Sequence, residues 1–279
     1  MTLIEFDAKT DTGVVRDHNE DAILADANAK LWVVADGMGG HACGEVASAI
    51  VLKTIKASAK IGQGLVESIQ KAHADVKAAA ESNINAKGMG STVVAMSYTG
   101  NSYTVAWVGD SRAYRLRKQK LQLLTRDHSY LELLKDNGLT EEAAREHPKR
   151  NIIVQAVGVG ELSPDTVEGE FKSGDRYLLC SDGLNDELAD DEIETILNSE
   201  QNTPELIDTL VERALHHGGR DNVSVIVIDI DPEQRRCVNN TALGAKLGKV
   251  WLANKPVLLP LLAGMLAATI MALIMLALR

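Results

Sequence analysis

The chain has 279 residues, of which 45% are hydrophobic and 24% are charged, so it can form one large domain with a substantial buried core. Its formal charge of −10 is unevenly distributed: residues 1–231 carry 23 bases and 38 acids, whereas residues 232–279 carry six bases and one acid. An acidic body without a basic stripe argues against nucleic acid as the main partner. It fits a protein that concentrates cations with carboxylates, although an acidic surface is also common in ordinary cytoplasmic proteins.

Strand-like and helical patterns alternate through residues 1–231. The last predicted helix has Thr203 as its N-cap, Pro204 at its first position and Gly218 just past its end. The middle strands follow one another without intervening helices, which favours an α+β arrangement of antiparallel sheets covered by helices. Runs rich in Val, Ile and aromatic residues predict strands at 31–35, 103–108, 176–180 and 223–228, and helical periodicity predicts helices at 44–59, 64–82 and 204–217.

The three cysteines are widely spaced and form no ligand motif, which is typical of free thiols in a reducing compartment. Cys180 lies within an apolar run and is expected to be buried. Neither Cys43 nor Cys180 begins a Cys-x5-Arg phosphate loop, so a phosphatase with a cysteine nucleophile is excluded.

The C-terminal part of the chain differs from the rest. Residues 232–256 are polar, basic and weakly periodic, as in a juxtamembrane linker whose bases attract anionic lipid. Residues 257–278 are 22 consecutive uncharged positions, and as a helix they would span about 33 Å, the thickness of one hydrocarbon core. A buried globular helix is the alternative, but such helices rarely contain so few polar residues.

The charges that flank this segment predict its orientation. Lys246, Lys249 and Lys255 precede it, and only Arg279 follows it. The positive-inside rule therefore places residues 1–231 in the cytoplasm, on a single-pass transmembrane helix in the cytoplasmic (inner) membrane. We expect the helix to tether the domain; a sensor role is the alternative.

Five aspartates are candidate ligands: four stand where an apolar strand meets a loop, and Asp21 ends the polar run Arg16–Asp21. Any one of them is ordinary turn chemistry, but carboxylates that converge on one site repel each other unless cations lie among them. Oxygen ligands select Mg²⁺ or Mn²⁺ over zinc. The glycines that follow Asp36 would let a backbone carbonyl approach such an ion. The five are Asp21, Asp36, Asp110, Asp182 and Asp221.

These carboxylates belong to eight motifs that resemble, in the same order, those of the metal-dependent Ser/Thr protein phosphatases of type 2C, in their bacterial form. The resemblance covers residues 5–229, and the shared order of all eight leaves little room for chance. The motifs are Asp11–Asp21, Asp36–His41, Gly88–Thr92, Val108–Arg112, Leu124–Ser129, His147-Pro148 with Val157-Gly158, Ser181–Leu184 and Gly219–Asn222.

The resemblance implies a four-layer α-β-β-α sandwich of two antiparallel sheets flanked by helices, with two divalent cations, Mn²⁺ or Mg²⁺, at one end. Asp36 would bridge the cations. Asp182 and Asp221 would complete one of them, while the Gly37 carbonyl and Asp21, through water, would serve the other. A third, weaker ion would involve Asp110.

The implied reaction is hydrolysis of phosphoserine and phosphothreonine in other proteins by metal-activated water. Arg16 matches the phosphate clamp, because a guanidinium can hold two phosphate oxygens. His41 matches the leaving-group acid of some relatives; alternatively, it is a loop histidine that positions water. Residues 127–160 match the flap beside the substrate groove.

A Ser/Thr kinase would be the opposing partner of such an enzyme. Two other functions remain open at this point: a non-catalytic scaffold for phosphoproteins, and a phosphomonoesterase for small molecules. A scaffold that had lost catalysis would lack a bridging aspartate or the clamp arginine, and this chain has both.

Overall fold

The computed structural model describes residues 3–39, 43–82, 86, 88–140, 143, 147–149, 152–199 and 201–232. The chain divides into two units, Met1–Pro232 and Glu233–Arg279. The predicted linker beyond Pro232, the predicted membrane span at 257–278 and His41 lie outside the described residues. Within the described ranges, no helix is both long enough and apolar enough to cross a membrane.

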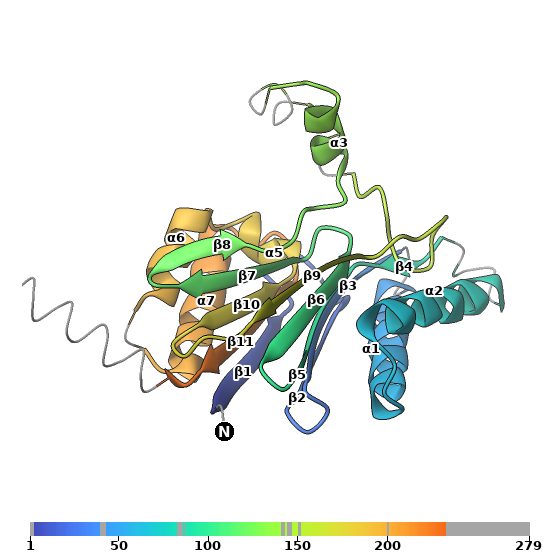
Figure 1. The fold of residues 1–279 in the computed structure, drawn as a ribbon. Helices are drawn as coiled ribbons and strands as arrows, with labels where there is room; N and C mark the ends of the chain where they lie inside the picture. Colours follow the sequence, from blue (N-terminus) through green and yellow to red (C-terminus); the bar gives the residue numbers. More distant parts are fainter. Residues whose placement is uncertain are drawn as a thin grey trace, which may run out of the picture. The chain divides into compact units, whose positions relative to one another are not determined.

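Two antiparallel sheets form the centre of the first unit (Figure 1). In the first, the strand order is β1-β11-β10-β7-β8, and in the second it is β2-β3-β5-β6-β9, with β4 paired to β3. The strands of the first sheet are β1 (Ile4–Asp11), β7 (Arg112–Arg117), β8 (Lys120–Leu123), β10 (Arg176–Cys180) and β11 (Val223–Ile230). Those of the second are β2 (Asp21–Asp26), β3 (Leu31–Met38), β4 (Gly90–Ser91), β5 (Val93–Thr99), β6 (Ser102–Val108) and β9 (Asp165–Glu170).

Helices cover the outer face of each sheet. In Figure 1, α1 (Cys43–Lys60) and α2 (Leu65–Ser82) lie against the second sheet, and α5 (Asp182–Asn185), α6 (Asp190–Leu197) and α7 (Thr203–His217) lie against the first. The short α3 (Tyr130–Asp136) projects beyond the sandwich, within the segment predicted to be the flap. The predicted four-layer α-β-β-α sandwich is therefore confirmed for this unit.

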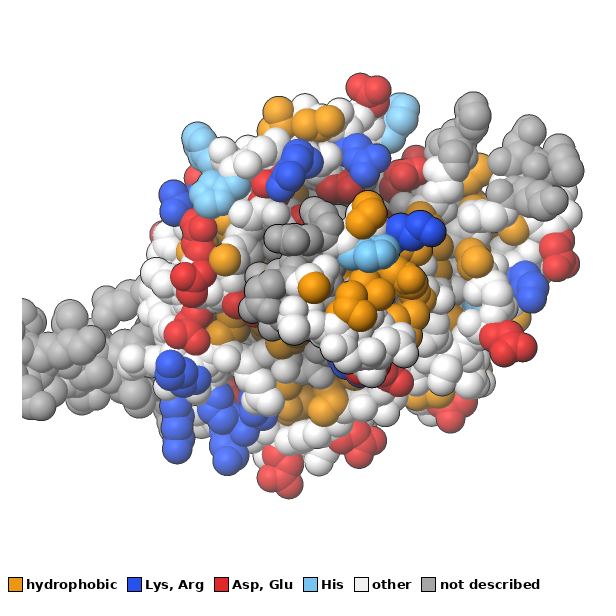
Figure 2. Space-filling view, turned by 90° about the horizontal axis from the view of Figure 1, so that it is seen from above, with side chains coloured by type: hydrophobic (Ala, Val, Ile, Leu, Met, Phe, Trp, Pro, Cys, Tyr) orange, Lys and Arg blue, Asp and Glu red, His pale blue; other side chains and the backbone are white. Residues whose placement is uncertain are grey.

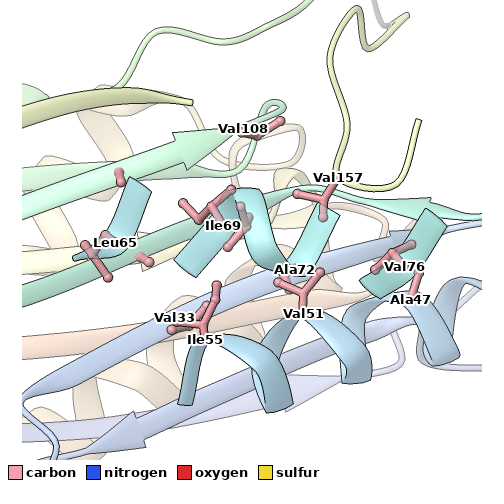
Figure 3. Packing of buried hydrophobic residues seen from close by; sticks show 14 of the residues in the cluster. Val33, Ala47, Val51, Ile55, Leu65, Ile69, Ala72, Val76, Val108 and Val157 are labelled. Carbon is pink, nitrogen blue, oxygen red and sulfur yellow. The ribbon is translucent and has the colours of Figure 1, made fainter. Parts of the chain in front are cut away.

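Three buried clusters correspond to the three interfaces between the four layers. One lies between the second sheet and α1 and α2, where Val51 and Ile55 pack against Ile69 and Val33 (Figure 3). Another lies between the first sheet and α5 to α7 and includes Cys180, which is buried as predicted. The third fills the space between the sheets and is rich in aromatic rings.

The first turn of α7 corrects one prediction. Its N-cap is Asn202, whose side chain accepts from the backbone N–H of Glu205 in a capping box. Thr203, predicted as the cap, is the first helical residue, and its hydroxyl donates to Asp229 in the core. That acceptor lies on a distant strand, so local sequence could not indicate it.

Candidate metal centre

The predicted site residues converge because the strand ends that carry them meet at one end of the sandwich. Asp21 begins β2 and pairs directly with Asp36 in β3. Asp182 begins α5 immediately after β10, and Asp221 lies two residues before β11. Asp110 follows β6. The prediction placed Asp36 after its strand, whereas β3 continues through it to Met38.

Hydroxyl groups hold the Asp36 segment in place. The Asp36 N–H donates to Thr92 Oγ1 at 3.0 Å, and Ser91 Oγ donates to the Asp36 carbonyl at 2.9 Å. Thr92 in turn shares a hydrogen bond of 2.7 Å with the hydroxyl of Ser111. Ser91 and Thr92 therefore brace the Asp36 segment through hydrogen bonds.

Gly37 is required sterically at this site. A Cβ at this position would lie 2.0 Å from the carbonyl oxygen of Gly44, the second residue of α1. The Gly37 N–H donates to the carbonyl of Glu20 at 3.1 Å. These contacts bring the start of α1 and the Glu20–Asp21 segment against the end of β3.

Two polar residues that were given no role beforehand organise the site. Ser181 donates its hydroxyl to Asp21 Oδ2 at 2.7 Å. Asn222 accepts from the Glu20 N–H, and its amide donates to the carbonyls of Thr12 and His18. Asn222 therefore attaches the Arg16 loop to the start of β11. In the sequence, the signal for both residues is their position directly beside a predicted ligand.

Burial and mutual repulsion make the aspartates reluctant to ionise. Burial raises the pKa of Asp36 well above its ordinary value, and the nearby Asp21 and Asp182 raise it further. Burial also raises the pKa of Asp21 to about 7 and that of Asp182 to about 6. The pKa of Asp110 is likewise raised well above its ordinary value by burial, with Asp182 as the largest charged contributor.

The site also contains carboxylate oxygens that protein groups leave unsatisfied. Among the described residues, Asp21 Oδ1, Asp110 Oδ1 and Asp182 Oδ1 are buried without a hydrogen-bond partner. An unpartnered buried oxygen is costly, and a divalent cation would satisfy it while lowering the pKa of each carboxylate. The donor set, oxygen only, fits Mn²⁺ or Mg²⁺.

The carboxylates do not form a closed cage. No group of three His, Cys, Asp or Glu side chains in the described part of the chain is already arranged to chelate one ion.

Arg16 lies at the edge of the site, with its side chain 53% exposed. Its Nη2 donates to Asp221 Oδ2 at 2.6 Å. An exposed guanidinium in contact with a candidate ligand can exchange that carboxylate for a phosphate group. The structure therefore brings Arg16 into contact with one of the predicted ligands, Asp221.

The root of the predicted flap is attached to the loop that carries Asp110. The His128 N–H donates to the Gly109 carbonyl at 2.9 Å, and the Gly109 N–H donates to His128 Nδ1 at 3.2 Å. Arg112 makes a two-point contact with Asp127, at 3.0 Å from Nε and 2.7 Å from Nη2. His128 is buried and stacks on Trp107, so it packs the flap root against the end of β6.

A cleft of about 760 Å³ adjoins this root. It lies between α3, β8 and the segment that joins α5 to α6. Its lining includes Arg126 and Asp186, so it combines basic and acidic groups close to Asp182.

An α-β-β-α sandwich with desolvated aspartates and an arginine at one end defines a metal-dependent hydrolase suited to phosphate esters. Residues 14–217 match the family model described as protein phosphatase 2C. The chain belongs to the protein phosphatase 2C family, and the predicted enzyme class, a metal-dependent phosphoprotein phosphatase, is confirmed at the level of the family.

Relatives carry corresponding names. The serine/threonine protein phosphatase PstP of Mycobacterium tuberculosis is 38% identical over 238 residues, which are 82% of this chain and 45% of the relative. This chain thus spans about half the length of that relative. The serine/threonine phosphatase stp of Listeria monocytogenes is 36% identical over 242 residues, 81% of this chain and 96% of the relative.

A solved structure shows the same fold with metal. The catalytic domain of serine threonine protein phosphatase PstP in complex with two manganese ions is 36% identical, with a TM-score of 0.74. The comparison covers 82% of this chain and 99% of that one. It supports a binuclear centre of the predicted kind.

Proposed function

We propose that this chain is a protein Ser/Thr phosphatase that hydrolyses phosphoserine and phosphothreonine at a binuclear Mn²⁺ or Mg²⁺ centre. We further propose that its C-terminal segment tethers it to the cytoplasmic membrane with the catalytic domain in the cytoplasm, where it opposes a Ser/Thr kinase. The observation that carries the activity is the group of five aspartates at one end of the sandwich, several with raised pKa and with unsatisfied buried oxygens.

The proposed ligands differ in the cation that each would bind. Asp36 would be shared by the two cations, and Asp182 and Asp221 would complete one of them. The Gly37 carbonyl, with Asp21 through water, would serve the other, and Asp110 would take part in a third, weaker site. Two cations held in this way would activate a water molecule for attack on phosphorus near neutral pH.

The other residues bind the substrate and move its proton. Arg16 is the proposed clamp, and its guanidinium would hold two phosphate oxygens and offset the charge that develops on them. His41 is the proposed acid that protonates the leaving Ser or Thr oxygen. It follows the Gly39–Gly40 pair, and its own placement is outside the described residues.

Protein substrates are favoured over small phosphate esters by the surroundings of the site. The cleft of about 760 Å³ beside α3 offers room and charged groups for a peptide that extends from the phosphorylated residue. The names of the relatives, which are serine/threonine phosphatases, support the same substrate class.

The activity is tested with residues 1–232 and a phosphothreonine peptide, with Mn²⁺ and with a chelator. We expect phosphate release that depends on Mn²⁺ and is lost in Asp182→Ala, while the exposed control Glu81→Gln keeps full activity. Tight binding of the phosphopeptide without turnover, by a folded and Mn²⁺-loaded protein, would instead support the scaffold function.

The tether is tested separately with the full chain in bacterial membranes. We expect the full chain to resist extraction by alkaline carbonate and residues 1–232 to be soluble. Quantitative extraction of the full chain would refute the tether and leave the proposed activity intact.

A further inference from the structure

The metal centre and the exit of the C-terminal segment lie at opposite ends of the first sheet. Strand β11 begins two residues after Asp221 and ends at Ile230, directly before the chain leaves the domain at Pro232. Its eight residues span about 25 Å. Strand β10 runs the other way, from Arg176 at the exit end to Cys180, two residues before Asp182 at the metal centre.

Two turns lie beside this exit. Register places Leu116 of β7 level with Arg176, and Arg176 level with Asp229, so the β7–β8 turn stands at the exit end. The β9–β10 turn is attached there directly, because the Gly174 N–H donates to the Ile230 carbonyl and Ser173 Oγ donates to Asp231.

Both turns present lysines. Residues 115–120 contain four bases and no acid, and one of the four, Arg117, pairs with Asp175. Lys118 and Lys120 of the β7–β8 turn and Lys172 of the β9–β10 turn are exposed, and within the described ranges none of them forms an ion pair. Figure 2 shows Lys and Arg side chains gathered at the lower left, on the side where Figure 1 draws the β7–β8 hairpin tip.

Three acidic side chains at this end have an ion-pair or hydrogen-bond partner within the domain. Asp175 pairs with Arg117, and Asp231 accepts from the Leu3 N–H and from Ser173. Glu194 of α6 accepts from the Leu121 N–H. Glu5 of β1, level with Asp229, and Glu170 at the end of β9 are exposed carboxylates on neighbouring strands.

The backbone of the β7–β8 turn has a conformation that is unusual for the residues it contains. Lys118 and Gln119 have φ values of 53° and 64°, so two consecutive residues with a Cβ occupy the left-handed region. Such turns normally contain Asn and Gly, and outliers of this kind motivate a functional explanation. Here the unfavourable conformation keeps a lysine at the tip of the hairpin.

We propose that the exit end of the domain, with Lys118, Lys120 and Lys172, docks on an anionic lipid bilayer. The inference rests on the proposed membrane tether, which would hold this end near the surface, where each lysine is attracted to acidic headgroups. Docking in this way turns the metal centre toward the cytoplasm, about the length of β11 away from the lipid.

The test uses residues 1–232, which form a compact unit with its own buried clusters and correspond to a catalytic domain solved in isolation for a relative. The protein is anchored by a C-terminal histidine tag to phosphatidylcholine vesicles that contain a nickel-chelating lipid, with or without phosphatidylserine. The acetylation rate of each lysine is then measured by mass spectrometry.

We expect phosphatidylserine to slow acetylation of Lys118, Lys120 and Lys172 about fivefold each, and high salt to abolish the effect. Lys53 and Lys77, exposed on α1 and α2, should react equally on both vesicles. Equal rates at the three turn lysines would overturn the proposal. Because the tag replaces the natural tail, this result does not depend on whether residues 257–278 span a membrane.

Variants test whether the charge is responsible. Lys118→Asn with Lys120→Gln should remove the protection of Lys172 without loss of thermal stability, because Asn tolerates the left-handed conformation. Lys118→Arg with Lys120→Arg should keep that protection. Protection of Lys172 that survives removal of both charges would also contradict the proposal.

Discussion

At the scale of single residues, burial makes the charged form of several site aspartates unfavourable unless a proton or a cation offsets the charge. Ser181 donates to Oδ2 of Asp21, whereas Oδ1 of Asp21 is buried without a partner among the described residues. A proton or a cation can satisfy that oxygen. Metal binding and protonation therefore compete for the same groups.

This competition predicts how the stability of the chelated protein depends on pH. The folded-state pKa values of Asp21 and Asp182 are raised to about 7 and about 6, so the folded protein holds protons that the unfolded chain releases near pH 4. Stability from these groups is complete below the unfolded pKa and is lost as pH rises through the folded values. We expect the urea midpoint in chelator to fall between about pH 5 and pH 8.

Mn²⁺ should reverse this trend, because it binds the deprotonated carboxylates and stabilises the folded state above pH 7. The variant Asp21→Asn should flatten the pH dependence in chelator. A midpoint in chelator that rises across this range would contradict the raised pKa values.

His41 can be tested through the leaving group. A serine or threonine alkoxide needs a proton as it departs, whereas p-nitrophenolate is stable without one. We expect His41→Gln to lower kcat on a phosphothreonine peptide about 100-fold and kcat on p-nitrophenyl phosphate only slightly. Equal losses on both substrates would favour the alternative role, in which His41 positions water.

At the scale of elements, the contact between Arg112 and Asp127 connects the start of β7 to the root of the flap. Both side chains are largely buried, with 24% and 14% exposed. Arg112 also donates to the Tyr114 hydroxyl, which donates to Asp190 at the start of α6. One guanidinium thus orients the flap root and the first turn of α6 together.

Removing this guanidinium should be costly. We expect Arg112→Met to destabilise the domain by about 3 kcal/mol, because it leaves the Asp127 carboxylate buried and unpaired close to Asp110. Arg112→Lys should recover only part of the loss, since an ammonium cannot make the two-point contact. Urea unfolding in chelator measures both changes.

The double variant Arg112→Met with Asp127→Leu provides the control for this explanation. If the unpaired carboxylate causes the loss, the double variant should be more stable than Arg112→Met alone. A double variant as unstable as the single one would mean that the loss comes from packing of the arginine stem.

The sequence predicted the elements best where local pattern dominates. The apolar runs at 103–108 and 176–180 became β6 and β10 with nearly the predicted bounds, and the five aspartates converged because their strands end on the same side. The roles of Thr203 and Asn222 could not be predicted in this way. Both residues bind partners far away along the chain, Thr203 with Asp229 and Asn222 with His18.

At the scale of the whole molecule, catalysis and localisation are assigned to different parts of the chain. The family model and all five site aspartates lie within residues 1–232, which form one compact unit. The proposed tether begins at the opposite end of β11 from the metal centre. The tail can therefore position the enzyme without contributing to its chemistry.

Truncation tests this separation. We expect residues 1–232 and the full chain in detergent to have the same kcat and KM on a phosphothreonine peptide, within about twofold. The two proteins are compared at equal concentrations of Mn²⁺-loaded active sites. A tenfold difference in kcat would favour the sensor role for residues 257–278.

The central claim, that the aspartate cluster is a binuclear cation site, is tested most directly by titrating Mn²⁺ into metal-free residues 1–232 in a calorimeter. We predict two tightly bound ions per chain, with more protons released at pH 6 than at pH 8, because Asp21 and Asp182 are partly protonated at the lower pH. Asp36→Asn should abolish tight binding of both ions, and Glu81→Gln should change neither. A single tight ion, or two ions that survive Asp36→Asn, would contradict the account.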